Sequence, residues 1–211
     1  GTNARTAEMC KLVENSSRDS QIAFANELSL ICDKADINVW ELINLANKHP
    51  RVNILKPGCG VGGHCIAVDP YFIVSDYPAE SKMIGTAREV NNYKSFWCVE
   101  KIQNEKLQFE LKYGRKPKTA LLGLAFKPNI DDLRESPAKY ITKKVLQNSN
   151  NGENFIVEPN IESHSIYKLT DFNEAINKSD IIVFLVAHKE FFGLDINNGK
   201  KILDFCGINE K

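Results

Sequence analysis

Residues 57–72 read P-G-C-G-V-G-G-H-C-I-A-V-D-P-Y-F, and no other part of the chain is so specialised. Four of these residues are glycines: Gly58, Gly60, Gly62 and Gly63. Glycine adopts positive φ at little steric cost and lets a ligand come close to the backbone. The stretch therefore predicts an irregular loop that holds a ligand, and we interpret the rest of the chain as organised around it.

Three of these glycines, Gly58, Gly60 and Gly63, also spell G-x-G-x-x-G. That motif indicates dinucleotide binding when a strand precedes it and a helix opens at its third glycine. Here Pro57 precedes the glycines, and the pair Asp69-Pro70 is typical of an N-cap followed by proline in a first helical turn. The sequence therefore predicts a helix from about Asp69, too late for the dinucleotide fingerprint.

This helix start would place the thiol of Cys65 near the positive end of a helix, four residues ahead of the Asp69 carboxylate. Such a position can activate a thiolate. The alternative is that Cys65 is a small buried apolar residue and Asp69 a simple cap. The flanking glycines favour the first reading, since a nucleophile that must touch a bulky substrate needs open backbone around it.

The composition, with 43% hydrophobic and 26% charged residues, is ordinary for a globular protein. Lys+Arg and Asp+Glu both number 27, so we expect no nucleic-acid partner and no anionic membrane surface. Without a membrane-length apolar run or a signal peptide, we expect a soluble cytoplasmic protein. The six cysteines form neither a C-x-x-C pair nor a His/Cys cluster, which predicts reduced thiols and no metal site.

Two helices are expected before the loop, at 4–34 and 39–47. In the first, a stripe of hydrogen-bonding side chains recurs at helical spacing: Glu8, Lys11, Asn15 and Arg18. The spacing alone favours a solvated face, but a line of polar groups turned inward remains the alternative.

A further helix is expected at 81–113, far longer than the usual ~11–12 residues. A helix of this length typically links two domains or lies along a subunit interface. Its apolar residues would be exposed in a monomer, and we therefore predict a homodimer. The residues concerned are Phe96, Trp97, Ile102 and Leu107. The turn-rich 114–117 that follows predicts a domain boundary, giving domains 1–113 and 114–211.

From Lys118 onward, buried strands alternate with helices. Strands are expected at 119–126, 155–157, 180–186 and 201–205, with helices at 136–147 and 171–177. Continuous apolar strands separated by helices indicate a parallel sheet covered on both faces. Ligands of such sheets bind at the carboxyl ends of the strands. Those ends carry Lys127, Glu158, His188 and Asp204.

The chain resembles the carboxyl-terminal two-thirds of the UDP-glucose/GDP-mannose dehydrogenase family. The resemblance rests on A-R-T-A-E-M-C-K-L-V-E-N, I-A-F-A-N-E-L-S-L-I-C, H-P-R-V-N-I-L, G-V-G-G-H-C-I-A-V-D-P-Y-F and G-L-A-F-K-P-N-I-D-D-L-R-E-S-P. It implies an α/β fold class: an all-helical dimerisation domain joined by a long helix to a Rossmann-like, nucleotide-binding parallel-sheet domain. The family's amino-terminal NAD-binding domain has no counterpart in this sequence, so we expect a fragment that is inactive as it stands.

The family oxidises a primary alcohol of a nucleotide sugar to a carboxylate with two NAD per sugar. By resemblance, Cys65 is the nucleophile, Lys11 and Asn15 stabilise the oxyanion, and Asp69 positions or deprotonates water. The other residues implied are Arg51, which would cross the dimer interface to the partner's substrate, Gly62 and Gly63 in the substrate loop, Lys127 at the nucleotide sugar, and Arg134 at the NAD pyrophosphate.

The subgroup motif V-G-G-H-C-I-A-V-D-P favours UDP-N-acetyl-D-mannosamine as substrate, with UDP-N-acetylglucosamine and UDP-glucose as alternatives. Two other classes stay open. The chain could be a non-catalytic nucleotide-sugar-binding and dimerisation module. It could also be an acyl-transfer enzyme with Cys65 as nucleophile and His64 as base, although neighbouring side chains seldom face each other.

Overall fold

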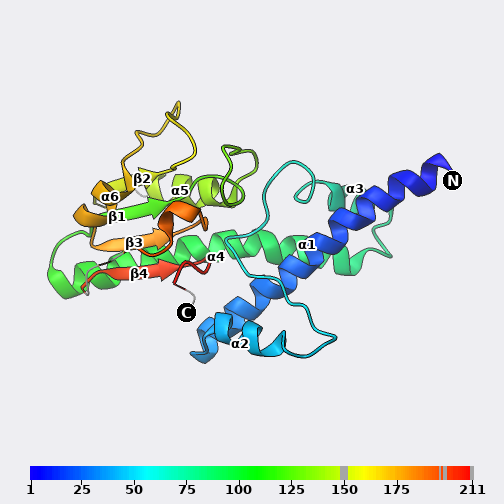
Figure 1. Ribbon diagram of the computed structural model, residues 1–211, viewed down its shortest axis with the longest axis horizontal. Coiled ribbons are helices and arrows are strands. Elements are labelled where there is room, and N and C mark those ends of the chain that lie inside the picture. Colours follow the sequence, from blue (N-terminus) through cyan, green and yellow to red (C-terminus); the bar gives the residue numbers. More distant parts are fainter. Residues whose placement is uncertain (148–151, 195, 197–198, 210–211) are drawn as a thin grey trace. The chain divides into compact units, whose positions relative to one another are not determined.

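The computed structural model describes residues 1–147, 152–194, 196 and 199–209. Its contacts divide the chain into two compact units, 1–94 and 95–211, and this division falls within the long helix α4, Lys82–Tyr113. The domain bounds that we predicted from the sequence, 1–113 and 114–211, stay a prediction. Figure 1 shows helices α1 to α4 and a sheet of four strands, as the alternation of patterns predicted.

The first unit contains α1 (Ala4–Ala35), α2 (Val39–Ala46), α3 (Asp69–Asp76) and the beginning of α4. Local signals explain the helix starts. Asn3 caps α1 by accepting the Thr6 N–H at 2.9 Å, and Asn38 caps α2 by accepting the N–H groups of Trp40 and Glu41. Helix α1 packs against α3 and α2, so the loop between α2 and α3 is held by helices at both ends.

The second unit is built on a parallel sheet in the order β2-β1-β3-β4. The strands are β1 (Thr119–Leu122), β2 (Asn154–Val157), β3 (Ile181–Phe184) and β4 (Lys201–Asp204), with α5 at Pro137–Gln147, α6 at Phe172–Lys178 and a short 3-10 helix at Lys189–Phe191. Strands β1 and β3 are completely buried, which confirms the prediction of a covered parallel sheet.

Strand β1 ends four residues earlier than its apolar run predicted. The cause is Gly123, which has φ of 99° and lies against Val186: a Cβ at this position would be 2.6 Å from the Val186 Cβ. Leu124 and Ala125 are buried all the same, and their N–H groups donate to the Glu158 carboxylate. Burial alone therefore does not distinguish the end of the strand from the loop that follows.

Two of the four apolar residues that we expected to be exposed on α4 are covered within the second unit. Ile102 is fully buried, and the Trp97 ring packs edge-on against Phe205 with 5.9 Å between centroids. Phe96 and Leu107 are exposed, at 49% and 58%. The expectation that these side chains are exposed was therefore wrong for Ile102, whereas Trp97 is half-buried.

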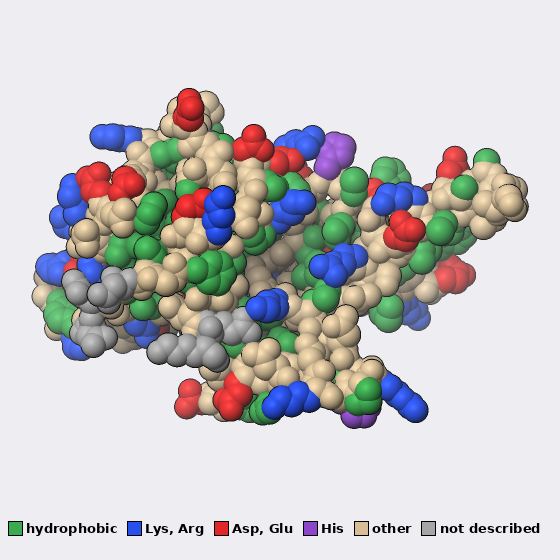
Figure 2. Space-filling view, in the orientation of Figure 1, with side chains coloured by type: hydrophobic (Ala, Val, Ile, Leu, Met, Phe, Trp, Pro, Cys, Tyr) green, Lys and Arg blue, Asp and Glu red, His purple; other side chains and the backbone are tan. Residues whose placement is uncertain are grey.

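Acidic and basic side chains are mixed on the face shown in Figure 2, in keeping with the equal totals of 27. No helix in the described part of the chain combines the length and the apolar character that crossing a bilayer requires.

Candidate active site

The glycine loop has the irregular backbone that its sequence predicted. No helix or strand is assigned between α2 and α3, and Gly60 and Gly63 have φ values of 128° and 88°. Cys65 lies exposed near the end of this loop. The carbonyl of Cys65 accepts the backbone N–H groups of Val68 at 3.0 Å and Asp69 at 2.8 Å, so the residue is fixed to the start of α3.

Asp69 does not cap α3, contrary to the prediction. It is the first residue of the helix, Val68 occupies the N-cap position, and no side chain forms a capping bond. The Asp69 carboxylate instead accepts a hydrogen bond from the side-chain amide of Asn15, with 2.5 Å between Nδ2 and Oδ2. Asn15 is 8% exposed, so a partly buried hydrogen bond joins α1 to α3. Its acceptor, Asp69, lies four residues after Cys65 in the sequence.

Lys11 lies one turn before Asn15 on α1, but its head group points elsewhere. Its side chain is 64% exposed and its Nζ is 3.6 Å from Glu14. Glu8 and Arg18, the other members of the predicted polar stripe, are exposed as well. The stripe is thus a solvated face with one inward member, Asn15.

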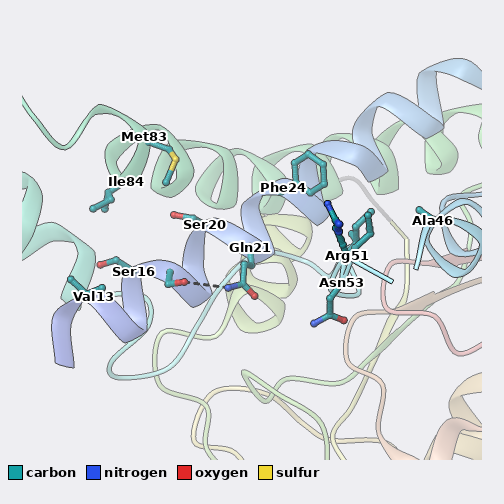
Figure 3. Close-up of a pocket in the computed structure, with 13 residues that line it drawn as sticks. Val13, Ser16, Ser20, Gln21, Phe24, Ala46, Arg51, Asn53, Met83 and Ile84 are labelled. Carbon is teal, nitrogen blue, oxygen red and sulfur yellow. Dashed lines mark hydrogen bonds between the residues drawn. The ribbon is translucent and has the colours of Figure 1, made fainter. Parts of the chain in front are cut away.

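Arg51 lines a groove of about 890 Å³ in the first unit. Figure 3 shows its side chain beside Phe24 of α1, with Met83 and Ile84 of α4 on the opposite side of the view. The lining residues are mostly apolar or small, and Cys65 is not among them.

In the second unit, the predicted cationic residues follow β1. Lys127 is exposed, with its Nζ 5.7 Å from the centre of the Phe126 ring. Arg134 is also exposed, and its guanidinium forms a fork with Asp132: the distances are 3.0 Å from Nε to Oδ1 and 2.7 Å from Nη2 to Oδ2. Arg134 would have to leave this partner to reach another anion.

Glu158 and His188, at the carboxyl edge of the sheet, form a fully buried pair and not a ligand group. Oε2 of Glu158 accepts the N–H groups of Leu124 at 2.7 Å and Ala125 at 2.9 Å, and lies 3.1 Å from His188 Nε2. The backbone N–H of Asn129 donates to His188 Nδ1 at 3.0 Å. The two side chains thus hold the segment that carries Lys127 against the sheet.

The pKa of Glu158 is lowered from 4.5 to about 2. Burial raises this pKa, but the hydrogen bond from His188 and the backbone N–H donors outweigh burial. Asp204, the fourth group at this edge, accepts the backbone N–H groups of Cys206, Gly207 and Asn209 and so closes its own turn. Sequence reasoning placed both carboxylates at this edge but did not anticipate that they bind the protein's own backbone.

Sequence reasoning also missed a row of buried polar residues in the first unit, formed by Asp19, Asn26, Arg88 and Asn91. Their spacing on α1 and α4 follows helical periodicity, which is the signal that could have revealed them. Within the described residues, no group of three or more His, Cys, Asp or Glu side chains could hold a metal ion.

The chain is an α/β protein of two units. The first unit is helical and carries the cysteine loop, and the second is built on a parallel sheet. Known families match both parts: the central domain of the UDP-glucose/GDP-mannose dehydrogenase family matches residues 5–93, and the UDP-binding domain of the same family matches residues 120–208. The chain belongs to the UDP-glucose/GDP-mannose dehydrogenase family.

Relatives agree with this assignment over the whole chain. The UDP-N-acetyl-D-mannosamine dehydrogenases of Campylobacter jejuni and Escherichia coli K12 are both 55% identical, over 97% and 90% of this chain. The UDP-D-ManNAc dehydrogenase structure from Pyrococcus horikoshii matches 98% of the chain with a TM-score of 0.84 and 34% identity. The chain covers 50% and 47% of the two curated relatives and 49% of the solved chain, so it spans about half the length of each.

Proposed function

We propose that the whole protein is a cytoplasmic NAD-dependent dehydrogenase that oxidises UDP-N-acetyl-D-mannosamine to its uronate for surface polysaccharide synthesis. The relatives' names support the substrate, and UDP-N-acetylglucosamine and UDP-glucose remain the alternative sugars. The observation that carries the proposal is the contact between Asn15 and Asp69, since it brings two of the predicted catalytic groups together beside the Cys65 turn.

The G-x-G-x-x-G glycines lack the strand–turn–helix context of a dinucleotide fingerprint. The G-x-G-x-x-G glycines lie in a loop between two helices, and α3 opens six residues after Gly63. Arg134 is engaged by Asp132. We therefore assign no hydride step to these residues, and in the proposal NAD is held elsewhere in the whole protein.

Cys65 would act on the aldehyde formed by oxidation of the sugar's primary alcohol. Its thiolate adds to the aldehyde carbon to give a thiohemiacetal, and a second two-electron oxidation converts that adduct to a thioester. Water then attacks the thioester carbonyl, which releases the carboxylate and the Cys65 thiol. The exposed position of Cys65 at the end of an open loop supports this role, because the sulfur must reach a bulky substrate.

Asp69 and Asn15 would serve the hydrolytic step. Since Asn15 donates to one carboxylate oxygen, the other oxygen of Asp69 is free in this scheme to orient the attacking water. Lys11 would donate a hydrogen bond to the oxyanion once its ion pair with Glu14 breaks. That ion pair, with 3.6 Å between the charged atoms, lies on the surface and contributes little stability.

We further propose that the protein is a homodimer whose partner subunit covers the groove of Figure 3. Apolar side chains exposed on this unit support the proposal: Val13 at 50%, Phe24 at 53% and Met83 at 72%. Arg51 lies in the same groove, as expected of a residue that reaches the partner's substrate.

A test of the dehydrogenase assignment is to incubate the full-length protein with NAD and each of the three UDP sugars. We expect two NADH per sugar, with the highest kcat/KM for UDP-N-acetyl-D-mannosamine. Binding of UDP sugars without NADH formation would favour the non-catalytic module. For residues 1–211 alone, calorimetry should show weak UDP-sugar binding and almost no NAD binding.

A further inference from the structure

A row of buried polar side chains joins α1 to α4 in the first unit. Asp19 and Asn26 come from α1 and Arg88 and Asn91 from α4, and none is more than 4% exposed. Asp19 Oδ1 accepts from Arg88 Nη1 at 2.5 Å and from Asn91 Nδ2 at 2.8 Å. Asn26 Nδ2 donates to Asn91 Oδ1 at 2.9 Å. We call these four residues the buried polar row.

The buried polar row holds the entrance of the Cys65 loop. The backbone N–H of Gly58 donates to Asn26 Oδ1 at 2.9 Å, across 32 positions of sequence. Gly58 does not need to be glycine for lack of space, because an added Cβ would meet nothing within 4 Å. The hydrogen bond to Asn26 therefore helps to fix the backbone at this end of the loop.

The same row also reaches the far end of the loop, at α3. The Arg88 guanidinium lies over the Tyr71 ring, 5.6 Å from its centre, and Arg88 Nη2 donates to Asn92 Oδ1 at 3.0 Å. Asn92 Nδ2 in turn donates to the Tyr71 hydroxyl at 3.0 Å. Gly58 and Tyr71 flank Cys65 on either side, so one hydrogen-bonded network holds both ends of the segment that carries the thiol.

Such a row is a costly way to join two helices. Burial raises the pKa of Asp19, and the charge and hydrogen bond of Arg88 offset this only in part. Among the described residues, Asp19 Oδ2 and Arg88 Nε have no hydrogen-bond partner. Apolar side chains of similar size would join two helices at lower cost, whereas a buried polar network fixes one relative arrangement of its parts.

We propose that Asn26 and Asn91, supported by Asp19 and Arg88, are positioning residues that set the geometry of the Cys65 loop. They touch neither Cys65 nor Asp69 and act by holding the loop backbone at Gly58. The inference deepens the proposed function, because its catalytic consequence depends on Cys65 being the nucleophile.

The test compares Asn26→Leu with a matched control, Ser29→Ala, in the full-length protein. Ser29 lies one turn further along α1 and accepts a buried hydrogen bond from Lys94 of α4 at 2.6 Å. The control thus disturbs a hydrogen bond between the same two helices. Both variants lose a buried polar partner, so both should lower the melting temperature.

Two readouts separate positioning from general stability. In Asn26→Leu, amide exchange of the 57–68 segment should rise by about tenfold or more, because the Gly58 N–H loses its acceptor. The alkylation rate of Cys65, resolved by mass spectrometry and normalised to exposed Cys10, should change several-fold. In Ser29→Ala both quantities should stay at wild-type values. Equal loop exchange and equal Cys65 reactivity in the two variants would overturn the proposal.

A second variant keeps the test decisive if Asn26→Leu fails to fold. Asn26→Asp retains an oxygen acceptor for the Gly58 N–H but loses the donor to Asn91, so loop exchange should remain near wild type. Loss of protection at Gly58 in this variant would contradict the assigned role. Exchange and alkylation need no sugar or NAD, so they test positioning whether or not Cys65 is catalytic. If it is, Asn26→Leu should lower kcat by about ten- to a hundredfold, more than it changes KM.

Discussion

Asn15 and Asp69 are 54 positions apart in the sequence, yet the side-chain amide of one donates to the carboxylate of the other at 2.5 Å. This contact attaches the first turn of α3 to the middle of α1. Because the Cys65 carbonyl accepts the Asp69 N–H at 2.8 Å, α1 also determines where the cysteine turn lies. The hydrogen bond therefore connects the helical scaffold to the proposed chemistry.

The first prediction concerns that hydrogen bond. Asn15→Ala in the full-length protein should slow turnover by about a hundredfold, since Asp69 loses the donor that orients it. If Asp69 acts on water, thioester hydrolysis becomes the slow step and a Cys65 adduct accumulates in intact-mass spectra. Arg18→Ala, an exposed change one turn further on, should leave the rate unchanged. A slow Asn15→Ala enzyme without adduct would place Asp69 in an earlier step.

The second prediction is that the folded protein loses stability in acid as Glu158 becomes protonated. Its pKa is about 2 in the folded chain against 4.5 for the ordinary group. A depressed carboxyl pKa stabilises the fold above pH 4.5, and this stabilisation is lost as pH falls toward 2. Urea unfolding of wild type from pH 7 to 3 should show a loss of about 2 kcal/mol from this group. Glu158→Gln should be less stable than wild type at pH 7, and its free energy of unfolding should fall less steeply as the pH is lowered. If the free energy of unfolding depended on pH equally in the two proteins, the depressed pKa would not belong to Glu158.

The third prediction concerns Lys106, which is 3% exposed and donates to Asn154 Oδ1 at 2.7 Å. Burial lowers its pKa from 10.5 to about 8. Since the unfolded chain binds the proton more tightly, wild-type stability should rise between pH 8 and 10.5. Lys106→Met should stabilise the protein at pH 7 by about 1–3 kcal/mol, and the gain should shrink at alkaline pH. As a control, Lys143→Met at an exposed position should change the free energy of unfolding little at either pH. If Lys106→Met instead destabilised the protein at pH 7, the hydrogen bond from Lys106 to Asn154 would outweigh the cost of burying the charge.

The fourth prediction addresses the proposed dimer. Phe24→Glu places a charge on the apolar groove, so a partner subunit seated there should dissociate at micromolar concentration in a sedimentation experiment. Ile166→Glu alters an equally apolar residue, 75% exposed in the second unit, and should leave the dimer intact. A wild-type protein that sediments as a monomer would remove the basis for the dimer.

Periodicity and turn chemistry predicted most of the fold. Helices α1, α2, α4, α5 and α6 begin and end within one residue of their expected bounds, and α3 begins at Asp69 as expected. Caps such as Asn38 are local signals, which is why the sequence reveals them. The early end of β1 could not be predicted in this way, since it depends on the contact between Gly123 and Val186. The N-cap prediction for Asp69 was wrong for the same reason: the partner of its carboxylate, Asn15, lies far away in the sequence.

The packing of α1 shows a second limit. Apolar side chains of an amphipathic helix usually face the core, but Val13 and Ile31 of α1 are 50% and 56% exposed, while Asp19 and Asn26 are completely buried. A pattern of hydrophobicity cannot identify a buried face that is polar. The buried polar face of α1 is identified only by its hydrogen bonds to Arg88 and Asn91 of α4 in the structure.

Cys65 is the proposed nucleophile of a two-step oxidation, and the decisive measurement is the yield of NADH per sugar for Cys65→Ala. Without the thiol, the full-length variant should stop after interconverting alcohol and aldehyde, with at most one NADH per sugar and no adduct in intact-mass spectra. Cys65→Ser should form a slow or stalled covalent intermediate, because a hydroxyl ionises far less readily than a thiol. An alanine variant that makes two NADH and a carboxylate at a near-normal rate would show that Cys65 is structural.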